Sequence, residues 1–191
     1  MGAERGVSLA GLAMGAGGTL DAGGGFQGAL RFAGRDVLDA AGGWDVYVAR
    51  LDGGGALQWV RDVGAETERS LTVEALVATT EGPLLGGSFE GRVDFDPGPG
   101  RRPLEAEARA GFLLALDGDG ALAWADSAAA SGVRHVLGIA AGAGGRAAIA
   151  GVGQRERDEG EAAYGDREDE GKEEDEGSEV VVLGLDLTAR H

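Results

Sequence analysis

The chain contains no cysteine, a single lysine and two histidines among its 191 residues. Without cysteine it has no disulfide and no thiol nucleophile, and cysteine usage leaves the redox compartment open. No run of about 18 apolar residues occurs, which excludes a membrane-spanning helix. Aromatic residues make up only 5% of the chain, so a hydrophobic core must be built mainly from small side chains.

Positive charge is also scarce. Seventeen Lys and Arg residues stand against 33 Asp and Glu, which gives a net charge of −16. A surface this negative repels phosphate backbones and anionic lipids, so we expect no nucleic-acid partner and no membrane insertion. Residues 155–179 hold 13 acids and 4 bases, and like charges at this density predict a disordered, solvated loop. Its composition does not specify cation binding.

Glycine, in contrast, occupies 38 positions. Each glycine inside a helix costs about 1 kcal/mol relative to alanine, so a long helical bundle is excluded. The chain instead repeats itself. The segment Phe26-Gln-Gly-Ala-Leu-Arg-Phe32 returns as Phe89-Glu-Gly-Arg-Val-Asp-Phe95, and 51–59 returns as 116–124. The three copies form a single array and span residues 7–69, 70–131 and 132–191. The third copy is incomplete and carries the acidic segment 155–179.

Each copy predicts four short apolar strands bounded by Gly and Asp turns. The first strand is expected at 9–14, 73–78 and 136–141, and the second at 19–26, 83–89 and 147–152. After long connections, roughly 33–43, 96–110 and 154–178, the third strand is expected at 45–51, 111–116 and 180–185. The fourth is expected at 56–60 and 121–125. This pattern indicates an all-β fold of antiparallel four-stranded blades in a partial, open β-propeller-like array.

Two segments carry a family resemblance. Gly87-Ser-Phe-Glu-Gly-Arg-Val-Asp-Phe-Asp-Pro-Gly-Pro-Gly100 resembles the first half of the bacterial SBBP-type β-propeller repeat, and 43–59 resembles its second half. The similarity spans about 2.75 repeats of about 64 residues. It implies a larger secreted or surface protein whose partners are undefined. Residues 7–14 fall inside a repeat and follow a segment that is not clearly basic, so no signal peptide is expected. The compartment of this chain stays open.

Several residues are candidates for chemistry. Gly142-Ala-Gly-Gly-Arg-Ala147 fits a dinucleotide fingerprint, but a short Gly-rich strand follows it and not a helix, so a hairpin turn is the favoured interpretation. Asp117 aligns with Asp52 and is interpreted as a turn cap and not a metal ligand. His135 has no matched acid in any recognisable motif. We therefore expect no catalytic, cofactor-binding or metal-binding residue, and no cofactor.

Tryptophan gives the packing signal. Trp59 and Trp124 recur at one position of the repeat, which predicts packing between neighbouring blades, whereas Trp44 has no counterpart and is the freer candidate for a surface contact.

The sequence favours a non-enzymatic scaffold or interaction module with a protein or glycan partner. A closed propeller typically has 4–8 blades, so three copies suggest a fragment, a diverged remnant or a chain that closes by self-association. The alternative function is part of a propeller hydrolase or lyase whose site lies in the central channel.

Overall fold

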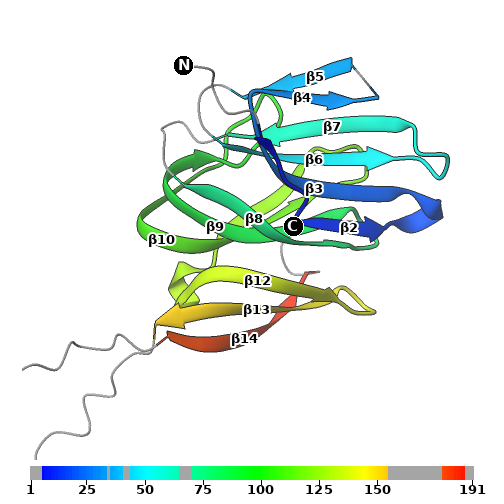
Figure 1. Cartoon of the computed structure of the whole chain (residues 1–191). Helices are drawn as coiled ribbons and strands as arrows, with labels where there is room; N and C mark the ends of the chain where they lie inside the picture. Colours follow the sequence, from blue (N-terminus) through cyan, green and yellow to red (C-terminus); the bar gives the residue numbers. More distant parts are fainter. Residues whose placement is uncertain (1–5, 34, 41–43, 65–69, 155–177, 188–191) are drawn as a thin grey trace, which may run out of the picture.

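The computed structural model describes residues 6–33, 35–40, 44–64, 70–154 and 178–187, and these form an all-β protein. Antiparallel sheets are stacked in chain order, with the second sheet between the first and the third (Figure 1). No described residue lies in an α-helix, and the short helical turns are 3₁₀ segments at Ala16–Gly18 and Ala129–Ser131. None of the sheets seen in the described residues closes into a barrel. The expected all-β, antiparallel, open array is confirmed.

Each sheet is a meander of consecutive strands. The first sheet consists of β1 (Gly6–Val7), β2 (Gly11–Met14), β3 (Leu20–Gln27), β6 (Asp45–Leu51) and β7 (Leu57–Val63). β1 and β2 both pair with the same strand, β3, and together take the place of the expected first strand. The second sheet consists of β8 (Leu71–Ala78), β9 (Pro83–Asp94), β10 (Pro103–Leu116) and β11 (Leu122–Ser127). The third consists, within the described residues, of β12 (Val133–Ala141), β13 (Arg146–Gln154) and β14 (Ser178–Asp186).

The long connections expected after the second strand are partly wrong. In the first repeat, β4 (Ala29–Phe32) and β5 (Arg35–Asp39) form a separate hairpin. In the second repeat, β9 and β10 continue past the sheet as a paired ribbon as far as Asp94 and Pro103. Leu104 and Ala106 alternate with acidic residues, and their side chains pack on the core. An alternation with a period of two is typical of a β-strand.

The acidic segment expected at 155–179 lies outside the described residues, except for its last two positions. Ser178 and Glu179 begin β14 and pair with Gln154 and Gly153 of β13.

Glycine shapes the first strand of every sheet. β8 and β12 are bulged, and β1 and β2 are separated at the same point of the repeat. Opposite each irregularity lies a glycine: Gly24, Gly87 or Gly151. A Cβ atom at any of them would collide with a backbone carbonyl oxygen of the neighbouring strand, so only glycine permits this approach.

A second set of glycines lets one sheet approach the next. A Cβ atom at Gly23 would lie 2.8 Å from Leu76 Cδ1 of the second sheet. A Cβ atom at Gly86 would lie 2.6 Å from Val136 Cγ1 of the third sheet. Both contacts are closer than ordinary packing permits, so the sheets meet where a side chain is missing.

Two clusters of buried residues fill the spaces between the sheets. The first joins Val46 and Val48 to Leu85 and Leu114, together with the contacting rings of Phe89, Phe95 and Phe112. The second joins Leu113 of the second sheet to Val136 and Ile149 of the third. Trp59 packs against the first cluster and Trp124 against the second. The predicted packing of these tryptophans between neighbouring repeats is confirmed as packing between sheets, and Trp44 is 45% exposed as expected of a surface residue.

An ion pair ties the first sheet to the second. Arg50 Nε and Nη2 donate to the two carboxylate oxygens of Asp21 at 2.7 and 2.9 Å. Arg50 Nη1 and Trp59 Nε1 both donate to the Gly118 carbonyl in the β10–β11 turn, at 2.8 and 3.0 Å. Asp21 is fully buried, and its hydrogen bonds are the main cause that raises the pKa of Arg50. In the second sheet the corresponding pair is apolar, Leu84 opposite Ala115.

The β4–β5 hairpin covers part of the first sheet with a small core. Phe26 and Phe32 contact the Tyr47 ring edge-on, with centroids 6.2 and 6.4 Å apart. The Tyr47 hydroxyl donates to the Ser8 carbonyl at 3.2 Å, and burial raises the pKa of this phenol.

The glycine contact predicts the effect of one methyl group. Gly86→Ala should lower the free energy of unfolding by about 1–3 kcal/mol, because the new Cβ forces Val136 aside in a packed interface. Gly184→Ala is the matched control, since nothing lies within 4 Å of a Cβ there. Urea unfolding of both variants measures the difference, and equal stabilities would contradict the close approach.

The Asp21–Arg50 pair predicts a non-additive double mutant. Arg50→Ala should cost about 3–5 kcal/mol, because it leaves the buried Asp21 carboxylate unpaired. Asp21→Leu combined with Arg50→Ala copies the apolar pair of the second sheet and should recover most of that loss. A double-mutant cycle in urea measures the coupling, and simple additivity would show that the pair is not a unit.

Tyr47 predicts a loss of stability at high pH. Its raised pKa means that folding favours the neutral phenol. The contribution is therefore full below the usual tyrosine pKa of about 10 and is lost as the pH rises through the higher folded-state pKa. Tyr47→Phe should show a smaller decline in the free energy of unfolding between neutral and alkaline pH. An identical decline in both proteins would contradict the assignment.

Candidate functional site

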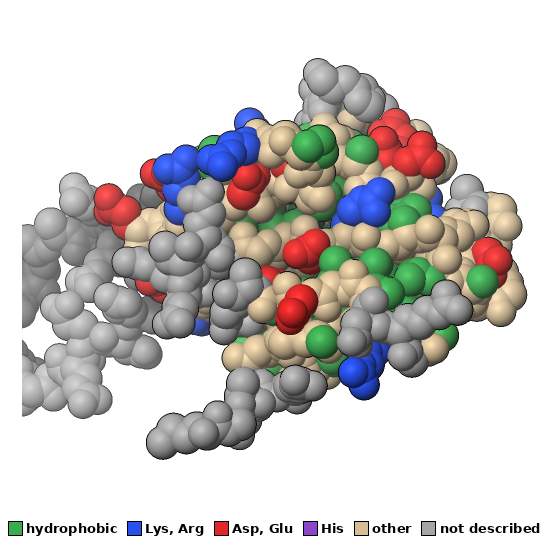
Figure 2. Space-filling model, turned by 90° about the horizontal axis from the view of Figure 1, so that it is seen from above, with side chains coloured by type: hydrophobic (Ala, Val, Ile, Leu, Met, Phe, Trp, Pro, Cys, Tyr) green, Lys and Arg blue, Asp and Glu red, His purple; other side chains and the backbone are tan. Residues whose placement is uncertain are grey.

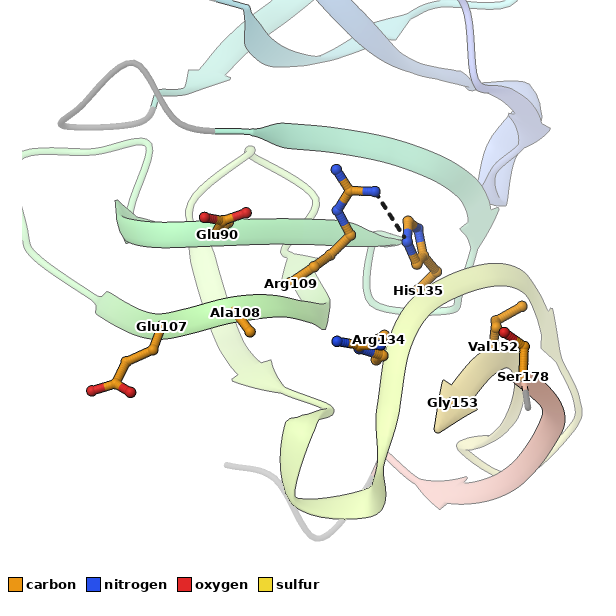
Figure 3. Close-up of a pocket in the computed structure, with 9 residues that line it drawn as sticks. All are labelled: Glu90, Glu107, Ala108, Arg109, Arg134, His135, Val152, Gly153 and Ser178. Carbon is orange, nitrogen blue, oxygen red and sulfur yellow. Dashed lines mark hydrogen bonds between the residues drawn. The ribbon is translucent and has the colours of Figure 1, made fainter. Parts of the chain in front are cut away.

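A pocket of about 520 Å³ lies between the second and third sheets. Its polar lining consists of Glu90 on β9, Glu107 and Arg109 on β10, Arg134 and His135 on β12, and Ser178 on β14 (Figure 3). The site is therefore formed where residues of one sheet meet residues of the next.

Two bulges bring the cationic side chains into this pocket. On β10 the register shifts between Ala106 and Ala110, so Arg109 stands outside the regular ladder. On β12 it shifts between Val133 and His135, which leaves Arg134 as the additional residue. Bulges redirect side chains, and these two turn guanidinium groups toward the same space.

His135 lies between an acid and a base from the second sheet. Its Nδ1 is 3.7 Å from Glu74 Oε1, and its Nε2 is 3.4 Å from Arg109 Nη1, as Figure 3 shows for the arginine. A guanidinium only donates, so Nε2 accepts and the ring proton belongs on Nδ1, facing Glu74. Glu74 Oε1 also accepts from the Thr72 hydroxyl at 3.1 Å. The second carboxylate oxygen of Glu74, Oε2, is buried and has no hydrogen-bond partner in the described structure.

The pocket carries both signs of charge. Arg109 and Arg134 supply donors, and Glu90 and Glu107 supply acceptors, at a partly open surface. Such a mixed lining suits recognition of a polar surface that offers both kinds of group. His135 has no matched acid in a sequence motif, and its acidic neighbour Glu74 comes from the adjacent sheet.

The other sequence candidates have structural roles. Asp52 Oδ1 accepts from the amides of Gly54 and Ala56, and Asp117 Oδ1 accepts in the same way from Asp119 and Ala121. The prediction of turn caps is confirmed at both positions. Within the described residues, no group of three or more His, Cys, Asp or Glu side chains is placed to hold a metal ion.

The Gly-rich segment after β12 is also a turn. Gly142 N donates to the Arg146 carbonyl at 2.8 Å, and Ala141 pairs with Ala147 across the hairpin. No dinucleotide-binding helix follows, since β13 begins at Arg146.

Sequence reasoning missed Glu74, Arg109 and Arg134. The available signal was a break in the repeat, because Glu74 aligns with Ala10 and Leu137, which are apolar.

Comparison with known proteins leaves the family open. Neither the protein-family models nor the curated proteins contain a match to the chain. No described helix is long and apolar enough to cross a membrane.

Proposed function

We propose that the chain is a non-enzymatic scaffold or interaction module built from β-propeller-type repeats of the SBBP kind, belonging to a secreted or surface protein. The observation that carries this proposal is the position of its exposed apolar side chains. Val7, Leu12 and Met14 lie on strands of the first sheet and Leu9 lies between β1 and β2, whereas Leu137, Val180 and Val182 lie on the third sheet. Contiguous exposed apolar faces are typical of binding surfaces.

Charge supports the same conclusion. Figure 2 shows apolar side chains gathered between separate acidic and basic ones on the side of the first sheet. The net charge of −16 opposes nonspecific association, so contacts at these faces favour a partner that fits. In the pocket, the arginines and glutamates add polar recognition next to the apolar faces.

A hydrolase or lyase is the second candidate, and Glu74 with His135 favours it because an acid orients a histidine there. Against it, the two ring nitrogens of His135 face Glu74 and Arg109. A second point against an enzyme is that Ser131, a possible nucleophile four positions earlier, lies in an exposed 3₁₀ turn and not among the residues that line the pocket.

The two functions separate in one set of assays. The chain is screened on a glycan array and against a displayed protein library, and in parallel on ester, glycoside and polyuronate substrates. We expect binders that are lost in Leu12→Glu, Val182→Arg or Arg109→Ala, and no turnover. These side chains are exposed, so each variant should unfold within about 0.5 kcal/mol of wild type. Turnover that His135→Ala abolishes and Leu12→Glu leaves unchanged would establish the enzyme and overturn the module.

A further inference from the structure

The same pair of faces meets at both interfaces between neighbouring sheets. We call the face that carries Gly23 and Val48 in the first sheet, or Gly86 and Leu113 in the second, the back face. The opposite face, carrying Leu76 and Leu85 in the second sheet, or Ile139 and Ile149 in the third, is the front face. At each interface the back face of one sheet packs on the front face of the next.

Strand register fixes which residues are equivalent. Gly23 pairs with Val48, Gly86 with Leu113, and Ala150 with Val182, which defines the same back-face position in every sheet. Leu12 pairs with Ala22, Leu76 with Leu85, and Ile139 with Ile149, which defines the same front-face position.

Two surfaces are left uncovered in the described structure: the back face of the third sheet, and the part of the first sheet's front face that β1 and β2 form. The β4–β5 hairpin covers another part of that front face, around Tyr47 and Ala49. On the back face of the third sheet, Val182 is 67% exposed, whereas its equivalent Leu113 is 3% exposed beneath the third sheet. On the front face of the first sheet, Leu12 is 57% exposed, whereas its equivalent Leu76 packs into the first core cluster. The exposed residues are therefore those that the repeat buries elsewhere.

The two uncovered faces also leave room for each other. At the internal interface, Gly23 lies against Leu76 and Leu85. If the back face of the third sheet met the front face of a first sheet in the same way, Ala150 would lie against Leu12 and Ala22. The methyl group gained at Ala150 is smaller than the three carbon atoms lost in the change from Leu85 to Ala22, so the two faces can approach there without a clash.

We propose that two copies of this chain associate head to tail, each placing the back face of its third sheet on the front face of its partner's first sheet. This contact continues the internal interfaces and rests on the proposed function as an interaction module. A head-to-tail contact closes into a ring or extends into a filament. Two copies bring six such sheets together, which lies within the 4–8 blades of closed propellers. In this arrangement a second copy occupies both uncovered faces, and the assembly ends at the dimer.

Charge variants on the two faces test the geometry. Sedimentation velocity of the full chain across a tenfold dilution series should show a monomer–dimer equilibrium without larger species. Leu12→Glu and Val182→Arg should each raise the dimer dissociation constant about tenfold or more, because either change puts an unpaired charge into both contacts of the ring. Ala130→Glu, at an exposed site in a 3₁₀ turn, is the control and should dissociate like wild type.

Mixing the two variants gives the deciding result. A dimer of one Leu12→Glu chain and one Val182→Arg chain contains one unaltered contact and one that joins Glu to Arg, so the mixture should form dimers more tightly than either variant alone. A dimer broken only by Leu12→Glu, or only by Val182→Arg, would show a symmetric contact and overturn the proposal. Growth beyond the dimer would overturn the closed ring.

A monomer at every concentration would overturn self-association altogether. The proposed function would still stand after that result if the glycan array or protein library yields a binder that is lost when either face is altered. Conversely, turnover that depends on His135 would overturn the proposed function without affecting a dimer. Circular dichroism and urea unfolding of each variant exclude loss of folding as the cause of dissociation.

Discussion

Close approach of backbone to backbone is the constraint on which the rest of the structure depends. Gly24, Gly87 and Gly151 let a bulged first strand press its carbonyl against the second strand, and Gly23 and Gly86 let one sheet press against the next. Apart from four buried phenylalanines, the core consists mainly of Val, Leu and Ala, which have little volume to fill a wide gap, so the sheets must come close. The glycines at these positions therefore permit close packing of strands and sheets and are not a sign of disorder.

Positions where the repeats differ carry the individual features of the protein. The buried Asp21–Arg50 pair is found at the first interface, while the corresponding residues in the second sheet are Leu84 and Ala115. Glu74 likewise departs from the apolar residues at its equivalents and reaches His135 across the next interface. The repeated framework sets the spacing between sheets, and the exceptions add charge to the contacts between them.

Much of the fold followed from the repeat. The expected strands at 45–51 and 83–89 correspond to β6 and to the first part of β9, and the recurring Asp52 and Asp117 cap equivalent turns. The ribbon formed by β9 and β10 does not follow from the repeat, because the alternation of Glu with Leu and Ala that forms it occurs only in the second copy. The pocket was missed because Arg109 and His135 are 26 positions apart and meet only through bulges in different sheets.

The sequence by itself determined the all-β class, the repeated antiparallel strands and the turns, since these depend on local alternation and on Gly and Asp at short spacing. Tertiary structure alone decided which faces meet and which stay uncovered. Val182 and Leu113 are both apolar and occupy the same position in the repeat, yet one is exposed and the other buried. The difference lies in whether another sheet covers the face, and no local pattern encodes the neighbour that a strand face will have.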